Sequence, residues 1–275
     1  MSPRKIAIVT GGNKGIGFAI VKGLCEKFAG DVYLTARNIT RGQEAVAKLK
    51  TLGFNPLFHQ LDITNEESVS AFRDYIKTNN ILIDVLVNNA GVFASPTLSM
   101  GEQAEINVMV NYFGTLKVCQ GLFPFLRENA RVVNISSSSG RLLRIPGTDI
   151  QAKFKDPNLS IEGLNKLMKQ YIQDAKDNTY QSKGWGENAY VVSKVGLTAL
   201  SNIQQKEFDQ KPHLNISVNA VHPGYVDTDM TSHKGHLTIE EGAKAPLFLA
   251  LNAKLKGKYV WFDCRVVDWD GPAPQ

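Results

Sequence analysis

The sequence lacks the features that would place it in several large classes of protein. Its three cysteines, Cys25, Cys119 and Cys264, are odd in number for a disulfide framework and lack the spacing of metal ligands. It has no apolar run long enough to cross a bilayer and no signal-peptide core. The basic residues behind its net charge of +5 are scattered, without the block typical of nucleic-acid binding. We therefore expect a cytoplasmic protein without nucleic-acid or membrane partners.

What the chain does contain is the pattern of one α/β domain. Its 275 residues, 43% of them apolar, are enough to bury one sizeable core. Short apolar runs typical of buried strands alternate with stretches of helical periodicity, which favours a parallel sheet with helices on both faces. The predicted strands are Lys5–Thr10, Asp31–Ala36, Leu57–Asp62, Ile83–Asn88, Arg131–Ser136, Ile216–Val221 and Lys258–Phe262.

The helices between these strands have their own signals. Thr40, Thr64 and Thr238 each precede a Gln or Glu by three residues, the spacing of a capping box at a helix start. Helical periodicity also runs from near Gly15 and from Glu102 to Leu126. The whole pattern predicts a single Rossmann-type doubly wound domain over residues 1–275, with a seven-stranded parallel sheet.

One segment, residues 141–184, interrupts the alternation. It contains apolar residues at helical spacing behind Ser160, a residue type that favours helix N-caps. We expect a helical insertion whose apolar face packs on the domain itself; a partner-binding face is the alternative. That face consists of Leu164, Leu167, Met168, Tyr171, Ile172 and Ala175.

The turn after the first strand predicts a dinucleotide site, with a merely tight turn as the alternative. Glycines at a strand-to-helix turn let the backbone approach a pyrophosphate at the free amides of the helix N-terminus. The turn reads Thr10-Gly11-Gly12-Asn13-Lys14-Gly15-Ile16-Gly17.

The end of the second strand indicates which dinucleotide binds. NAD enzymes place a carboxylate there for the ribose 2′-hydroxyl, but this chain reads Ala36-Arg37. Arg37, with Lys14 and Arg41, therefore favours the 2′-phosphate of NADP(H). The alternative is that Arg37 and Arg41 are ordinary surface charges.

Further cofactor contacts are expected where the third and fourth strands end. Ligands of an open α/β sheet bind at the carboxyl ends of its strands, although polar residues there also form turns. The expected contacts are Asp62, Ile63, Asn88 and Ala90.

Tyr190 and Lys194 are the candidate catalytic pair. They lie four residues apart in a predicted helix, which places a phenol and an ammonium on one face. A nearby cation favours the phenolate and lowers its pKa from about 10 by ~1–3 units. We expect Tyr190, tuned in this way by Lys194, to protonate a carbonyl oxygen during hydride transfer.

Taken in chain order, these motifs resemble the short-chain dehydrogenase/reductase family. The markers are Gly11–Gly17, Asn88–Gly91, Asn111, Ser137 within Ser136–Gly140, Tyr190 with Lys194, and Pro223-Gly224 followed by Thr228. The residue sequence of the glycine turn and the insertion before Tyr190 are similar to those of the carbonyl reductase branch. In that branch the insertion covers the surface that other members use to oligomerise, so the resemblance implies a monomer that uses NADPH.

The resemblance also implies the role of each site residue. Lys194 binds the nicotinamide ribose, Ser137 hydrogen-bonds the substrate oxygen, and Asn111 holds a water that links Lys194 to solvent. Ser136 is the alternative to Ser137, and for Asn111 the alternative is a structural role with its amide tied to backbone. The turn after the sixth strand adds the cofactor contacts Pro223, Gly224, Val226 and Thr228.

Substrate contacts are expected beside this pair, in part from residues 225–237, which we interpret as a mobile substrate loop. The residues are Ser137, Ser138, Leu142, Trp185, Tyr190 and Tyr225. Related reductases often have a Cys before the Pro-Gly pair and a Trp after it. Here Val221-His222 precede the pair and Tyr225 follows it, so the resemblance does not extend to a preference for glutathione-bearing substrates. His233 and His236 lack further ligands nearby in the sequence, so we expect no metal site.

The resulting prediction is an NADPH-dependent reductase that converts ketones, aldehydes or quinones into alcohols or hydroquinones. Two alternatives remain. One is a biosynthetic reductase dedicated to a single pterin, prostanoid or steroid, and the other is a non-catalytic NADP(H)-binding regulatory protein.

Overall fold

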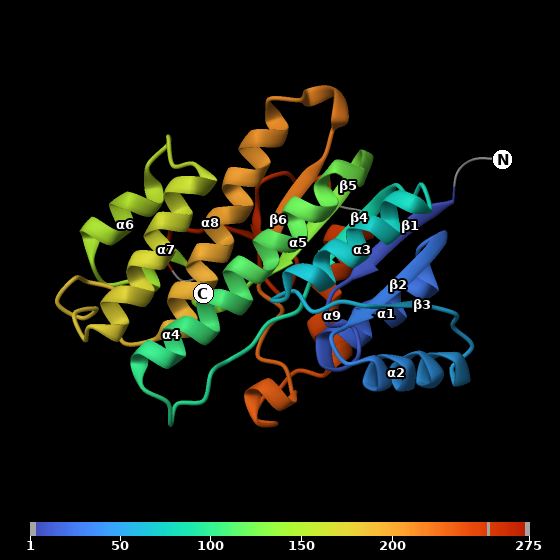
Figure 1. The fold of residues 1–275 in the computed structure, drawn as a ribbon, viewed down its shortest axis with the longest axis horizontal. Helices are drawn as coiled ribbons and strands as arrows, with labels where there is room; N and C mark the ends of the chain where they lie inside the picture. The colour runs from blue at the N-terminus through green and yellow to red at the C-terminus, as the bar shows by residue number, and fades with distance from the viewer. Residues whose placement is uncertain (1–3, 252–253, 273–275) are drawn as a thin grey trace.

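The chain folds around one twisted sheet (Figure 1). The computed structural model describes residues 4–251 and 254–272; the remaining residues of the predicted domain, 1–3, 252–253 and 273–275, lie outside this description. The strand order is β3-β2-β1-β4-β5-β6-β7-β8. The strands are β1 (Lys5–Val9), β2 (Gly30–Ala36), β3 (Leu57–Gln60), β4 (Ile83–Asn88), β5 (Leu126–Ile135), β6 (Ser217–Val221), β7 (Tyr259–Val260) and β8 (Val266–Val267).

The predicted Rossmann-type fold is confirmed, with one added strand. β1 to β7 pair in parallel, whereas β8 runs antiparallel to β7, with Val260 opposite Val266. The chain reverses after β7 because Trp261 N–H donates to the carbonyl of Arg265 at 2.8 Å. The sheet therefore has eight strands and not seven. β8 is too short to produce a period-2 pattern in the sequence.

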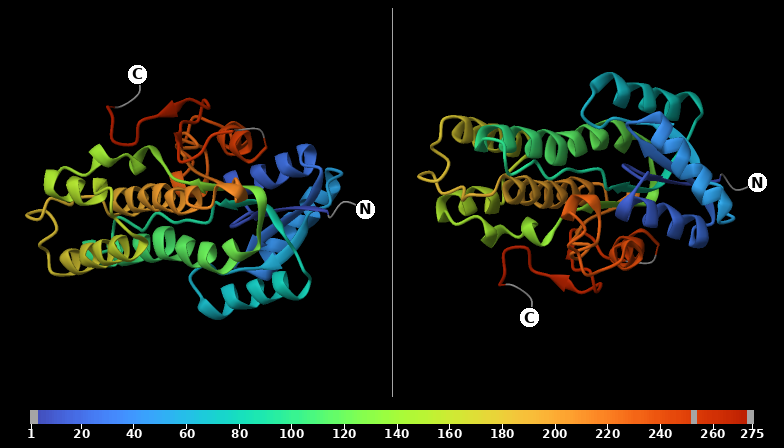
Figure 2. Two further views of the ribbon diagram at one scale, coloured as in Figure 1. Left: turned by 90° about the horizontal axis from the view of Figure 1, so that it is seen from above. Right: turned by 90° about the horizontal axis from the view of Figure 1, so that it is seen from below.

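Helices cover both faces of the sheet, and Figure 2 shows α1 and α9 on the side opposite α3. Apolar residues of α1, α2 and α9 form one core with the sheet, and those of α3 and α5 form another on the far face. These helices are α1 (Gly15–Lys27), α2 (Ile39–Thr51), α3 (Glu66–Thr78), α5 (Thr115–Leu122) and α9 (Ile239–Leu251). Within the described ranges, no helix is long and apolar enough to span a membrane.

Two of the three predicted helix starts are wrong. Helix α2 is capped by Asn38, which accepts from Arg41 N–H, and α3 by Asn65, which accepts from Ser68 N–H. Asn is a better N-cap than Thr, and the true caps lie two residues before Thr40 and one residue after Thr64. The third prediction is confirmed, because Thr238 and Glu241 bond reciprocally at the start of α9.

The long helix predicted over residues 102–126 is three segments. Ser99 and Glu102 form a capping box that opens α4 (Met100–Val108), which continues through a π-helical turn (Met109–Gly114) into α5. A short 3-10 turn (Phe123–Phe125) with Pro124 then leads directly into β5. π-helical turns inside helices occur frequently at functional sites, and this one contains Asn111.

The apolar face of the insertion packs on the protein itself, as predicted. The insertion contains α6 (Thr148–Lys155) and α7 (Ile161–Lys176), followed by α8 (Ala189–Asp209), and α7 is capped by Ser160 as expected. Helix α7 packs against α4 and α8, at the end of the molecule far from β3 (Figure 1). Leu164, Met168 and Tyr171 are fully buried there.

Candidate active site

The glycine-rich turn lies at the switch point of the sheet, where β1 neighbours both β2 and β4. Gly11 and Gly15 have φ of +64° and +54°, a region that glycine adopts at little cost. A Cβ on Gly17 would lie 2.4 Å from both the Gly11 oxygen and Asn89 Nδ2. Only glycine therefore allows this close turn.

The turn is braced by two residues to which the sequence analysis gave no role. The Thr10 hydroxyl accepts from the N–H groups of Asn89 and Ala90, both at 3.0 Å. Asn89 Nδ2 donates back to the carbonyls of Thr10 and Gly11, at 2.9 and 3.1 Å. The signal was present, since Asn89 stands inside the Asn88–Gly91 motif that was assigned to cofactor contact.

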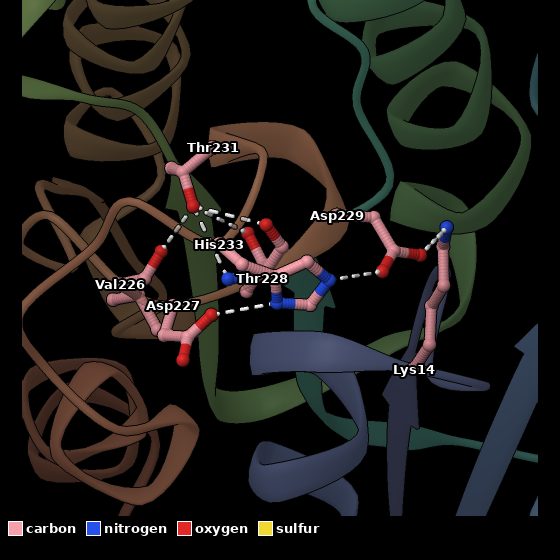
Figure 3. Close-up of polar contacts among 7 residues, drawn as sticks. All are labelled: Lys14, Val226, Asp227, Thr228, Asp229, Thr231 and His233. Carbon is pink, nitrogen blue, oxygen red and sulfur yellow. Dashed lines mark hydrogen bonds and ion pairs between the residues drawn. The ribbon is translucent and has the colours of Figure 1, made fainter.

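Lys14 extends from the glycine-rich turn to the loop after β6 (Figure 3). Its Nζ lies 2.6 Å from Asp229 Oδ2, and the other oxygen of Asp229 lies 3.2 Å from His233 Nε2. His233 Nδ1 contacts Asp227 Oδ1 at 2.7 Å, and this hydrogen bond, with the charge of Asp227 and that of Asp229, raises the pKa of the imidazole. The loop that follows Pro223-Gly224 is thereby linked to the predicted phosphate site.

The other predicted cofactor residues differ in their exposure and hydrogen bonding. Arg37 and Arg41 are exposed beyond the end of β2, and neither forms an ion pair within the described part of the chain. Asp62 Oδ1 accepts from the backbone N–H and the hydroxyl of Thr64, so its carboxylate also shapes the local turn. Ile63 is buried beside this turn.

The side chain of Asn88 lies inside the sheet. Its Nδ2 donates to Asn134 Oδ1 at 2.8 Å, and its Oδ1 has no hydrogen-bond partner among the described residues. The side chain is 2% exposed because Asn88 is the last residue of β4, between β1 and β5. Because the side chain is engaged within the sheet, a cofactor contact by Asn88 stays a prediction for its backbone alone.

Tyr190 and Lys194 lie in the first turns of α8, which Asn188 caps by accepting from Val191 N–H. Lys194 Nζ donates to the carbonyl of Ile135 at 2.8 Å and lies 5.6 Å from the centroid of the Tyr190 ring. Burial lowers the pKa of Lys194 to about 7. Burial also raises the pKa of Tyr190 to about 12, opposed by the hydrogen bond with Ser137. The net shift of the Tyr190 pKa is therefore upward and not downward as expected, because desolvation outweighs the contacts that favour the phenolate.

The first two of the four consecutive serines, Ser136 and Ser137, have different surroundings. Ser136 is buried, and its hydroxyl lies 2.8 Å from Thr198 Oγ1 on α8. Ser137 is half-buried, accepts from Ser139 N–H at 3.2 Å and reaches the Tyr190 hydroxyl. Of the two candidates, only Ser137 is placed beside the phenol.

Asn111 is held at both ends of its amide. Its Oδ1 accepts from Val92 N–H at 2.8 Å, and its Nδ2 donates to the Val92 carbonyl and to Ser193 Oγ, at 2.9 and 3.0 Å. Ser193 is the neighbour of Lys194 on α8. The backbone-tied geometry is therefore present, and it fixes Asn111 next to the candidate catalytic helix.

The loop after Pro223-Gly224 is closed by its own hydrogen bonds. Val226 pairs with Leu237, and Asp227 N–H donates to the carbonyl of Leu237 at 2.8 Å. Thr228 opens a short turn, and Tyr225 stays 46% exposed, open to a ligand.

His222, at the start of this loop, is buried against the ring of Trp261, and burial lowers the pKa of its imidazole to about 4. Its Nδ1 accepts from Gly224 N–H at 3.3 Å. The neutral imidazole thus supports the Pro-Gly turn.

Two predicted substrate residues are not available to a substrate. Leu142 is 0% and Trp185 1% exposed, and both belong to the core that the insertion forms with α8. The Trp185 indole donates to Asp174 Oδ2 at 2.9 Å, so it anchors α7. Ser138 and Tyr225 remain exposed beside the site.

The residues around the turn fit an NADP(H) dinucleotide. Lys14 is the N-cap of α1 and provides no side-chain cap, so the first amides of the helix stay open for phosphate oxygens. Two exposed guanidinium groups, Arg37 and Arg41, follow the end of β2 and have the chemistry to bind a 2′-phosphate. No cluster of three or more potential metal ligands occurs among residues 4–251 and 254–272.

The chain is similar to known proteins over most of its length. A protein-family model described as short chain dehydrogenase matches residues 5–148 and 179–237. Carbonyl reductase (NADPH) 1 of Rattus norvegicus is 46% identical over 255 residues, 91% of this chain and 92% of the relative. Its counterpart from Homo sapiens is 45% identical over 251 residues, 90% of either chain.

A solved structure extends the likeness to three dimensions. Salutaridine reductase from Papaver somniferum is 33% identical, with a TM-score of 0.85 over 95% of this chain and 100% of that one. The fold and the site define a dinucleotide-dependent oxidoreductase. The chain belongs to the short-chain dehydrogenase/reductase family and, within it, is similar to the carbonyl reductase branch.

Proposed function

We propose that the protein is an NADPH-dependent carbonyl reductase in which Tyr190 is the proton donor. The observation that carries the proposal is the convergence of Tyr190, Ser137 and Lys194 beside a glycine-rich turn that fits a dinucleotide. Relatives named carbonyl reductase support the reaction over most of the chain. The substrates are ketones, aldehydes or quinones, and the products are alcohols or hydroquinones.

Each residue has a task that follows from its position. The backbone of the glycine turn and the first amides of α1 would hold the pyrophosphate, and Lys14, Arg37 and Arg41 the 2′-phosphate. NADPH, when bound, supplies a hydride to the carbonyl carbon. Ser137 and Tyr190 hydrogen-bond the carbonyl oxygen, and Tyr190 donates its proton as negative charge develops there. Lys194 would hold the nicotinamide ribose and, when protonated, would stabilise the phenolate that remains on Tyr190.

The test is NADPH oxidation measured over a panel of carbonyl compounds, with NADH in parallel. Tyr190→Phe should abolish turnover and leave NADPH binding, followed by fluorescence, nearly intact, because the phenol oxygen is the only group removed. Ser136→Ala is the matched control for Ser137→Ala. Turnover retained by Tyr190→Phe contradicts the mechanism, and preference for NADH contradicts the role of Arg37. Activity on a single compound favours a dedicated reductase, and NADPH binding without any turnover favours a regulatory protein.

We also propose that the protein is a cytoplasmic monomer. Helix α7 covers α4 and α8 with a buried apolar face, which leaves less of that helix pair available for a second chain. Cys25, Cys119 and Cys264 are all free thiols, which suits a reducing compartment.

A further inference from the structure

The last described segment of the chain contacts the loop that carries Ser137. This loop, residues 137–142, connects β5 to the insertion through a short 3-10 turn (Ser138–Gly140). The Tyr259 hydroxyl, on β7, donates to the carbonyl of Ser137 itself. Burial raises the pKa of Tyr259, so its hydroxyl stays protonated and keeps this donor at every pH of interest.

Residues beyond β8 fasten the other end of the same loop. The Trp269 indole Nε1–H donates to the carbonyl of Gly140 at 2.7 Å. A backbone hydrogen bond joins the same two segments, because Leu142 N–H donates to the carbonyl of Trp269 at 3.0 Å. Arg141 Nη2 adds a bond to the carbonyl of Gly271 at 3.1 Å.

The opposite side of the loop is pressed against α8. A Cβ on Gly140 would lie 2.2 Å from Ser136 Oγ, 2.7 Å from Thr198 Oγ1 and 3.1 Å from the carbonyl of Lys194. The loop is thus fixed between the helix that carries Tyr190 and Lys194 and the final segment of the chain. Neither Tyr259 nor Trp269 lies in the part of the chain matched by the family model.

We propose that Tyr259 and Trp269 are positioning residues that set the place of Ser137 relative to Tyr190. Among the described residues neither side chain forms a hydrogen bond with the Tyr190 hydroxyl, although Tyr259 lies close enough to interact with Tyr190 electrostatically. Both bond instead to the serine loop, at the carbonyls of Ser137 and Gly140. The inference rests on the proposed role of Ser137. It adds that the segment after α9 is part of the catalytic geometry, because a loop bonded on one side alone would let the serine hydroxyl drift from the phenol.

The variants Tyr259→Phe and Trp269→Phe test the proposal, because each keeps an aromatic ring and removes one donor. We expect kcat to fall about tenfold in each, the effect of losing about one hydrogen bond. The KM for NADPH should not change, because the glycine turn is untouched. Lys155→Ala is the matched control: it removes the exposed 2.8 Å ion pair between Lys155 and Asp270, another contact of the same segment that does not touch the serine loop.

A double-mutant cycle separates positioning from general loosening of the fold. In a Ser137→Ala background, measured by single turnovers, Tyr259→Phe and Trp269→Phe should cause no further loss. Wild-type kcat in both Phe variants, or losses that add fully to that of Ser137→Ala, would overturn the proposal. If Ser137→Ala alone keeps full activity, the role of Ser137 falls and the positioning role with it, while the loss of turnover in Tyr190→Phe still tests the reduction separately.

Discussion

Lys194 is a side chain whose charge is strongly affected by burial. It is 4% exposed, its Nζ donates to the backbone of Ile135, and burial lowers its pKa to about 7. The charge of Lys194 therefore changes with pH close to neutrality. Tyr190, whose pKa burial raises to about 12, stays protonated throughout the same range.

This arrangement predicts a pH dependence of reduction. With a substrate that does not titrate, kcat/KM should fall as the pH rises through about 7, because Lys194 is charged below its pKa of about 7 and neutral above it. Only the charged form stabilises the phenolate left on Tyr190. The measurement is a profile of kcat/KM against pH, since that ratio reports the ionisation of the free enzyme.

Lys194→Arg is the control for this profile. A guanidinium keeps its charge at all these pH values, so whatever activity the variant retains should not fall near neutral pH. A flat wild-type profile from about pH 6 to pH 9 would contradict the assignment of Lys194.

The insertion shows how one buried carboxylate can anchor an element. Asp174 on α7 accepts from the Trp185 indole at 2.9 Å, from Lys183 Nζ at 2.7 Å and from Gln170 Nε2 at 2.7 Å. Burial alone would raise the pKa of Asp174, but these hydrogen bonds and the charge of Lys183 outweigh it and lower the pKa. The contacts tie the end of α7 to the segment that leads into α8.

We expect Asp174→Ala to lower the free energy of unfolding by about 3 kcal/mol, because it leaves a buried indole N–H without an acceptor. Urea unfolding measures the change. Because the folded pKa is lowered, the contribution of Asp174 is fully present above its unfolded pKa of about 3.9 and is lost as the pH falls below that value. The difference in the free energy of unfolding between wild type and Asp174→Ala should therefore shrink as the pH falls below about 3.9.

Asp177→Ala is the matched control for Asp174→Ala. Asp177 is exposed at the C-terminal end of the same helix and accepts only from Gln173 Nε2 among the described side chains. Little change is expected, and a loss as large as that of Asp174→Ala would contradict the role given to the buried anchor.

At the scale of the whole molecule, the insertion affects the oligomeric state that we expect. Helix α7 lies along α4 and α8 and buries its apolar residues against them (Figure 1). Sedimentation equilibrium over a range of concentrations should therefore give the mass of one chain. A mass of two chains that persists on dilution would contradict the proposal of a monomer.

Much of the fold could be predicted because its signals are local. Continuous apolar runs marked β1, β2 and β4, and the return of apolar residues every four positions marked α1. The helix caps were harder, since Thr40 and Asn38 both have side chains that can cap and only the geometry of the chain chooses between them. β8 was missed because two residues leave no period to detect.

The sequence by itself determined the glycine turn, the pair on α8 and the absence of a carboxylate after β2, because each depends on residue type and short spacing. Only the tertiary structure decided which serine faces Tyr190, that Asn88 lies inside the sheet, and that Trp185 anchors the insertion and is unavailable to a substrate. It also brought Tyr259 and Trp269 to the serine loop from more than a hundred residues away. Such contacts depend on how layers pack, and burial then sets the pKa of Tyr190 and of Lys194 in a way that sequence spacing alone does not reveal.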